Sequence, residues 1–163
     1  MVAKPGSSVD RMHRVVASWF GTGLILGRVR GSDLGSGTLG SLFALPIAVL
    51  VGETLGWPWQ IAAAVLVTVA SVWAARPFVS REGDAGWICA DEAAGTFIAV
   101  IGLQPWPALA AWAVFRLADI FKHLAPGVAA AEIRLPGAIG VTADDVVAGL
   151  YGLAAGHLLQ ALI

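Results

Sequence analysis

The length of the charge-free apolar runs constrains this chain more than any other feature. Residues 34–52 and 54–75 carry no charge and are separated only by Glu53, and residues 93–115 form a third such run. A fourth run, residues 146–163, continues to the last residue. A helix needs about 20 mainly apolar residues to cross the hydrocarbon core of a bilayer. The sequence therefore predicts an all-α helical membrane bundle with three to four spanning helices.

The composition agrees with a membrane protein and excludes several other classes. Hydrophobic residues make up 58% of the 163 residues and charged residues only 13%, whereas about a quarter of a soluble domain is charged. A net charge of −1 gives no electrostatic footprint for nucleic acid. The single cysteine, Cys89, has no partner for a disulfide or a zinc site. We expect one membrane domain, residues 1–163, with residues 1–14 as a flexible tail.

Breakers and short runs refine this picture. The third run contains the sequence QPWP at residues 104–107, and each proline removes a backbone donor, so we expect two shorter helices that meet at a turn. The uncharged run at residues 15–27 is too short to span and predicts an N-terminal interfacial helix. Glycine-rich residues 31–40, GSDLGSGTLG, predict a flexible or ligand-approaching loop.

Two further expectations concern charged and aromatic residues next to the runs. Arg76, Arg81, Glu82 and Asp84 predict a solvated loop. Tryptophan is enriched at membrane interfaces, so four tryptophans are expected to anchor the helices there: Trp57, Trp59, Trp87 and Trp106.

The distribution of basic residues predicts the orientation in the membrane. Five of the ten precede the first long run, namely Lys4, Arg11, Arg14, Arg28 and Arg30. The turn between the first two runs has none, so the N-terminus should be cytoplasmic. Alternation then returns residues 76–92 and 116–145 to the cytoplasmic side and leaves the C-terminus outside.

This topology places most acidic residues at the cytoplasmic face of the membrane. The topology was derived from the basic residues alone, so the grouping of the acidic residues is an independent result. The residues concerned are Asp33, Asp91, Glu92, Asp119, Asp144 and Asp145. Arg116, Asp119 and Lys122 recur at intervals of three and share one helix face. Mg²⁺ binds one or two carboxylates together with substrate oxygens and waters. The pattern is therefore typical of a hydrated magnesium ion that holds a phosphate.

The same residues also have purely structural interpretations. Thr142 and Asp145 match a capping box, so Asp144 and Asp145 would stabilise the first turn of a helix. Arg116 and Asp119 would form a helix surface pair. These interpretations remain open beside the magnesium site.

Four motifs together resemble the phosphatidylglycerophosphatase A family over about residues 19–152. They are SGTLGSLFALP at residues 36–46, ADEAAGTFIAV at 90–100, FRLADIFKHLAP at 115–126 and GAIGVTADDVVAGL at 137–150. The resemblance implies an all-α, Mg²⁺-dependent lipid phosphatase of the bacterial inner membrane. Such an enzyme converts phosphatidylglycerophosphate to phosphatidylglycerol and phosphate in phospholipid biosynthesis, with its active site facing the cytoplasm.

The resemblance also implies roles for individual residues. The metal ligands would be Asp91, Glu92, Asp144 and Asp145. The catalytic residues would be Asp119, Asp145, Arg116 and Lys122, with Asp119 either a further ligand or the general base. The substrate phosphate would be bound by Gly37, Thr38 and Ser41 together with Arg116 and Lys122.

The chain departs from the family pattern at two places. Ser36 stands where the family has proline, and residues 25–34, ILGRVRGSDL, form a longer link than the family's. Before the last motif, Glu132 and the sequence PGA at 136–138 replace an aspartate and a glycine pair. A related lipid phosphate is therefore an alternative substrate.

A small membrane transport protein for protons or divalent cations is the alternative function, because ionisable groups in apolar helices often mark ion pathways. The middles of the runs offer few polar groups beyond Thr68, Ser71 and Thr96. Clustering of the polar chemistry on one side favours an enzyme. A membrane anchor without chemistry would not need the clustered acids. Nothing in the sequence sets an oligomeric state.

Overall fold

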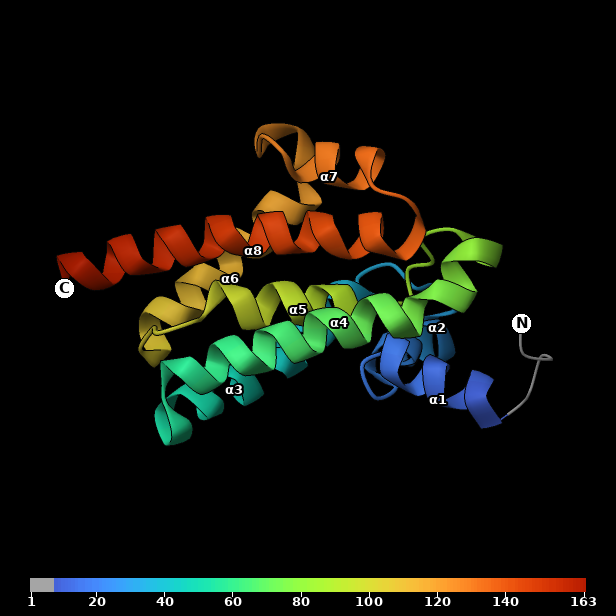
Figure 1. The fold of residues 1–163 in the computed structure, drawn as a ribbon, viewed down its shortest axis with the longest axis horizontal. Helices are drawn as coiled ribbons and strands as arrows, with labels where there is room; N and C mark the ends of the chain where they lie inside the picture. The colour runs from blue at the N-terminus through green and yellow to red at the C-terminus, as the bar shows by residue number, and fades with distance from the viewer. Residues whose placement is uncertain (1–7) are drawn as a thin grey trace.

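The computed structural model describes residues 8–163 as an elongated bundle of helices (Figure 1). Residues 1–7, including Lys4, lie outside the described part. The helices are α1 Ser8–Ala17, η1 Thr22–Leu24, α2 Ile25–Arg30, α3 Ser36–Leu55, α4 Trp57–Glu82, α5 Ala90–Ala99, α6 Pro105–Ile120, η2 Lys122–Leu124, α7 Val128–Arg134 and α8 Gly137–Leu162. Residues 8–163 contain no strand. The predicted all-α class is confirmed.

Three helices, α3, α4 and α8, are long and apolar enough to span a membrane. The third apolar run is instead the short pair α5 and α6, which confirms the break predicted at QPWP. Helix α5 ends at Ala99, and α6 begins with Pro105. Proline is tolerated in the first turn of a helix because the N–H it lacks would have no intrahelical acceptor. Helix α5 packs between α4 and α8, whereas α6 packs mainly against α8 and exposes its other side (Figure 1).

Helix α4 is longer than predicted. It continues to Glu82, so Arg76, Arg81 and Glu82 are helical, and the solvated loop expected there is wrong for these residues. The helix passes Pro77 because the neighbouring side chain of Phe78 is buried in a small core that α4 shares with α1. Tertiary burial here outweighs the cost of a proline inside a helix.

The start of α3 also corrects a prediction. Residues 31–35 form the connection to α2, but α3 begins at Ser36, so the second half of the predicted glycine loop is helical. Gly35, with φ of 90°, is the residue that turns the chain into the helix. Residues 36–40 of the glycine-rich stretch therefore form the first turns of α3.

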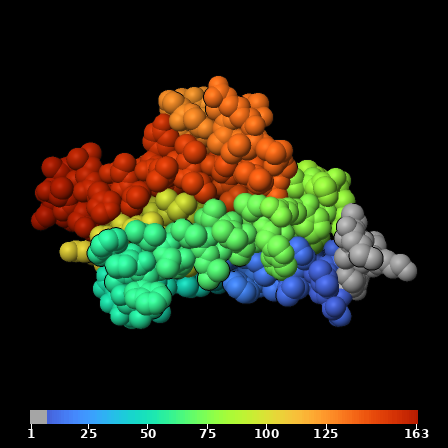
Figure 2. Space-filling view, viewed as in Figure 1, coloured from blue at the N-terminus to red at the C-terminus, as the bar shows by residue number. Residues whose placement is uncertain are grey.

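The N-terminal segment packs on the end of the bundle where α4 finishes (Figure 2). Helix α1 begins at Ser8, so half of the expected tail is helical. Trp87 is only 7% exposed and packs edge-on against Phe78 with ring centroids 4.8 Å apart. Its expected role as an interface anchor is wrong, whereas Trp57, Trp59 and Trp106 are exposed.

Two glycines allow α5 and α8 to cross at very short range. A Cβ atom on Gly149 would lie 2.6 Å from the carbonyl oxygen of Gly95, and one on Gly95 would lie 2.8 Å from that of Asp145. Small residues let membrane helices bring their backbones together in this way. The crossing places Asp145 of α8 beside the first turns of α5.

We predict that Gly149→Ala destabilises the protein. The added methyl group would meet backbone atoms of α5, which cannot rotate away, and overpacking of this kind costs about 1–3 kcal/mol. This exceeds the gain of up to about 1 kcal/mol from the higher helix propensity of alanine. Thermal unfolding in detergent micelles should show a lower melting temperature.

The matched control is Ala154→Val, which adds volume to an exposed position of the same helix. It should melt near the wild-type temperature. A Gly149→Ala variant as stable as the wild type would contradict the close crossing.

Candidate active site

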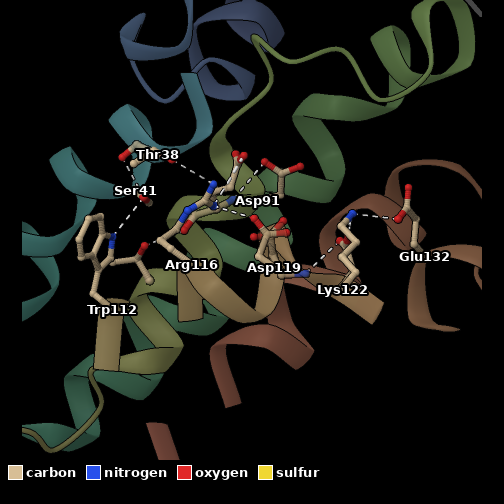
Figure 3. Close-up of polar contacts among 12 residues, drawn as sticks. Thr38, Ser41, Asp91, Trp112, Arg116, Asp119, Lys122 and Glu132 are labelled. Atoms are coloured by element: carbon tan, nitrogen blue, oxygen red, sulfur yellow. Dashed lines mark hydrogen bonds and ion pairs between the residues drawn. The ribbon is translucent and has the colours of Figure 1, made fainter. Parts of the chain in front are cut away.

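Acidic side chains from three helices converge beside the α5–α8 crossing (Figure 3). Asp91 and Glu92 lie in the first turn of α5. Asp119 lies in the last turn of α6, and Asp144 and Asp145 lie in the third turn of α8. The four aspartates are each less than 10% exposed. The sequence prediction that these acids gather in one place agrees with this geometry.

Three of the carboxylates form a compact group. Asp119, Asp144 and Asp145 each offer one oxygen, and these oxygens lie within 4.8 Å of one another. Asp145 Oδ1 is buried, and no hydrogen-bond donor of residues 8–163 satisfies it. Burying like charges is costly unless a cation compensates them, and carboxylate oxygens are the ligands that Mg²⁺ prefers. The Asp119–Asp144–Asp145 group therefore fits a divalent cation.

The capping interpretation of Asp144 and Asp145 is wrong. Helix α8 begins at Gly137, so both residues lie well inside it, and the dipole effect is confined to the first turn. The hydroxyl of Thr142 lies 3.0 Å from that of Ser71 in α4 and ties two helices together. Helix capping thus leaves the two buried carboxylates unexplained.

Arg116 is the central cation of the site. Its Nη1 lies 2.9 Å from Asp119 Oδ2 and 3.9 Å from Glu92 Oε1, and its Nη2 lies 3.5 Å from the hydroxyl of Thr38. The Arg116 and Asp119 side chains are only 9% and 11% exposed, so the alternative of a surface pair is wrong. The guanidinium links α6 to α3 and α5 (Figure 3).

Lys122 bridges two acids at the other edge of the site. Its Nζ donates a hydrogen bond to Glu132 Oε2 at 2.9 Å and contacts Asp144 Oδ2. Burial lowers the pKa of Lys122, but the hydrogen bonds to Asp144 and Glu132 outweigh this and raise it above its ordinary value. Sequence reasoning did not place Glu132 here, because a contact from α7 to η2 follows no helical spacing.

Burial raises the pKa values of the nearby carboxyls. It raises the pKa of Glu92 to about 7, against the opposing effects of a hydrogen bond with Asp91 and the charge of Arg116. Burial also raises the pKa of Asp119, although Arg116 and Lys122 act in the opposite direction. The two protein cations therefore compensate the acidic group only in part.

A cavity of about 530 Å³ opens next to Arg116. Its lining residues are Asp33, Leu34, Gly35, Gly37, Thr38, Gly86, Glu92, Arg116 and Ile120. Leu34 and Ile120 are exposed, whereas Gly37 and Arg116 are buried. The cavity thus joins a charged interior to an apolar rim, as an amphiphilic ligand would require.

Three of the residues predicted to bind phosphate, Gly37, Thr38 and Ser41, lie in the first two turns of α3. Gly37 makes room for Glu92, because a Cβ atom there would overlap the Glu92 carboxylate. Gly37 and Thr38 line the cavity. Ser41 is fully buried, accepts a hydrogen bond from Trp112 Nε1 at 3.1 Å and donates one to the Thr38 carbonyl. Ser41 therefore holds α3 against α6 and does not line the cavity.

Comparison with known proteins identifies the family. The family model described as phosphatidylglycerophosphatase A matches residues 15–160. The chain belongs to the phosphatidylglycerophosphatase A family. A protein of Bacteroides thetaiotaomicron named "Putative phosphatidylinositol-3-phosphatase" is 34% identical over 147 residues, which cover 84% of this chain and 86% of that protein. No solved structure shows a significant match.

Membership of the phosphatidylglycerophosphatase A family supports a membrane phosphatase that acts on a lipid phosphate. The acidic group that could hold a metal ion comes from two of the family-like motifs, FRLADIFKHLAP and GAIGVTADDVVAGL.

We predict that Mg²⁺ stabilises the wild-type protein and not the Asp145→Asn variant. A ligand that binds only the folded state raises stability by mass action. In EDTA the variant should melt at or above the wild-type temperature, because the amide removes one of the crowded charges. Thermal unfolding with Mg²⁺ and with EDTA measures both effects.

Glu53→Gln provides the control, since Glu53 is exposed near the end of α3, far along the helix from Gly37 and Thr38. It should keep the full Mg²⁺ response. An equal Mg²⁺ response in Asp145→Asn would rule out this carboxylate as a ligand.

Proposed function

We propose that the protein hydrolyses the terminal phosphomonoester of phosphatidylglycerophosphate with Mg²⁺ as cofactor, releasing phosphatidylglycerol and phosphate in phospholipid biosynthesis. One observation carries the proposal. Three buried carboxylates, one with an unsatisfied oxygen, lie next to an arginine that lines an amphiphilic cavity. Family membership supports the same chemistry.

The metal would be held by Asp119, Asp144 and Asp145, with Asp91 and Glu92 of α5 completing the acidic wall. Bound there, Mg²⁺ would supply Lewis-acid polarisation of the phosphoryl group and a more acidic water. Asp119 belongs to the carboxylate group and also contacts Arg116. It can therefore act as a ligand or accept the proton of the attacking water.

The cations have separate tasks in this proposal. Arg116 is always protonated, and its planar fork suits the oxygens of a phosphoryl group. Thr38 positions the guanidinium from α3, and Asp119 positions it from within α6. Lys122, held by Glu132, keeps Asp144 oriented and adds positive charge next to the transferred phosphate.

We further propose that the site faces the cytoplasm across the bacterial inner membrane. The described lysines and arginines precede α3, end α4, or lie from the end of α6 to α8. The α3–α4 turn, the α5–α6 connection and the end of α8 have none. Basic residues accumulate on the cytoplasmic side of membrane proteins.

A phosphatidylinositol phosphate is a second candidate substrate, favoured by the name of the Bacteroides relative. Both substrates carry a phosphomonoester on a polyol that is joined to diacylglycerol through a phosphodiester. The differences from the family motifs noted in the sequence at residues 25–34 and 136–138 also favour a related headgroup as the alternative.

Transport of protons or cations finds less support. Polar groups of the long helices are engaged in structural contacts: Gln60 donates to the Ala48 carbonyl at 3.1 Å and accepts from Gly102 N at 2.8 Å. Gln160 accepts from Gln104 N at 2.8 Å, and His157 Nε2 lies 3.0 Å from the Ile101 carbonyl. The bond to Ala48 joins α4 to α3, and the others join α4 and α8 to the α5–α6 connection. Within residues 8–163, these contacts trace no pathway from the acidic group.

The test is phosphate release by the purified protein in neutral detergent micelles. Phosphatidylglycerophosphate and phosphatidylinositol 3-phosphate are supplied in parallel, each with Mg²⁺ and with EDTA. We expect release with Mg²⁺ that EDTA abolishes, and a loss of at least about 100-fold in Arg116→Ala, as for loss of a charge-stabilising donor. If phosphatidylinositol 3-phosphate is hydrolysed faster, it replaces phosphatidylglycerophosphate as the proposed substrate. If neither lipid releases phosphate, the proposed phosphatase function is overturned.

A further inference from the structure

A second cavity, of about 240 Å³, lies beside the active-site cavity. It is lined by Arg14, Leu24, Gly27, Arg28, Asp33 and Trp87. Asp33 lines both cavities. The cavity next to Arg116 therefore has a neighbouring pocket, which is lined by two further arginines.

The two arginines come from different helices, and one of them packs on the Trp87 ring. Arg14 comes from α1, and its guanidinium carbon lies 5.1 Å from the centre of the Trp87 ring. The indole is itself fixed, because Trp87 Nε1 donates a hydrogen bond to Glu82 at 3.2 Å. Arg28 comes from α2. A pocket with two guanidinium groups and one carboxylate favours an anionic ligand.

Asp33 forms the partition between the cavities. Gly27 makes room for it, since a Cβ atom there would overlap the Asp33 carboxylate. On the other side, a Cβ atom on Gly86 would lie 3.3 Å from Asp33 Cβ. Asp33 is therefore closely surrounded at the place where it lines both cavities.

The segment around Arg28 also exposes apolar side chains. Ile25, Val29 and Leu34 are 40%, 76% and 82% exposed. Basic and apolar groups on one short segment are typical of the membrane interface, where lipid headgroups meet acyl chains. The second pocket therefore lies next to a segment whose composition suits the membrane interface.

We propose that Arg14 and Arg28 bind the phosphodiester of the substrate headgroup while its terminal phosphomonoester lies at Arg116. This inference rests on the proposed function and names the feature that selects the substrate class. Lipids with both a phosphodiester and a phosphomonoester occupy both cavities, whereas phosphatidate, which has only the monoester, occupies one.

The kinetic test compares phosphatidylglycerophosphate with phosphatidate in the same neutral micelles. Arg28→Gln and Arg14→Gln should each raise KM for phosphatidylglycerophosphate about tenfold or more, as expected for loss of a charge-assisted hydrogen bond. The kinetics on phosphatidate should stay unchanged. Arg30→Gln is the matched control, because Arg30 is exposed on the same helix and does not line the pocket.

Three kinetic outcomes would overturn the proposal. If the KM for phosphatidate rises as much as that for phosphatidylglycerophosphate, the arginines only attract anionic surfaces in general. The same conclusion would follow if Arg30→Gln raised the KM as much as Arg28→Gln does. If the KM for phosphatidylglycerophosphate is unchanged in Arg28→Gln and Arg14→Gln, these arginines do not bind the substrate.

A binding measurement separates this inference from the proposed function. Short-chain phosphatidylglycerol carries the phosphodiester and no monoester, so its binding by isothermal titration calorimetry needs no turnover. The wild-type protein and Arg30→Gln should bind it alike, and Arg28→Gln should bind it about tenfold more weakly. Equal affinity in all three proteins would overturn the second pocket even if the protein proves to be a phosphatase.

Discussion

The close crossing of α5 and α8 at Gly95 and Gly149 is the constraint on which the site depends. With no Cβ atom at either position, the backbone of α8 approaches that of α5 until the carbonyl of Asp145 lies against Gly95. The first turn of α5 and the third turn of α8 then share one region, and their acids face Asp119 from α6. In sequence each glycine follows its acidic pair by a few residues, so the same short motif supplies both the packing and the charge.

The crossing concentrates more negative charge than the protein neutralises. Five acids gather here: Asp91, Glu92, Asp119, Asp144 and Asp145. Within residues 8–163, the ion pairs that they form are those of Arg116 with Glu92 and Asp119 and that of Lys122 with Asp144. Burial raises the pKa values of Glu92 and Asp119. A buried ion costs several kcal/mol when its charge is not compensated. A divalent cation and the phosphate it attracts would resolve this imbalance. This excess of acids is the feature of the site that supports the proposed binding of a metal ion.

Much of this arrangement follows from the sequence, and the remainder depends on tertiary contacts. The long apolar runs correctly predict the three long helices α3, α4 and α8 but not their exact ends, and the QPWP motif correctly predicts the break between α5 and α6. The start of α8 differs from the prediction because Thr142 and Asp145 fit a capping box, whereas the helix already begins at Gly137, directly after Pro136. The pairing of Lys122 with Glu132 and the position of Asp33 between two cavities join separate elements. No spacing rule within one helix can predict such contacts.

The most direct test of the account is a metal-specificity switch at residue 145. The account predicts that Asp145→Cys is inactive with Mg²⁺ and regains phosphate release with Cd²⁺, because a thiolate prefers a softer ion than a carboxylate does. The wild-type protein, with its buried Cys89, is the control and should gain nothing from Cd²⁺. Full activity of Asp145→Cys with Mg²⁺ would contradict the claim that this buried carboxylate binds the catalytic metal.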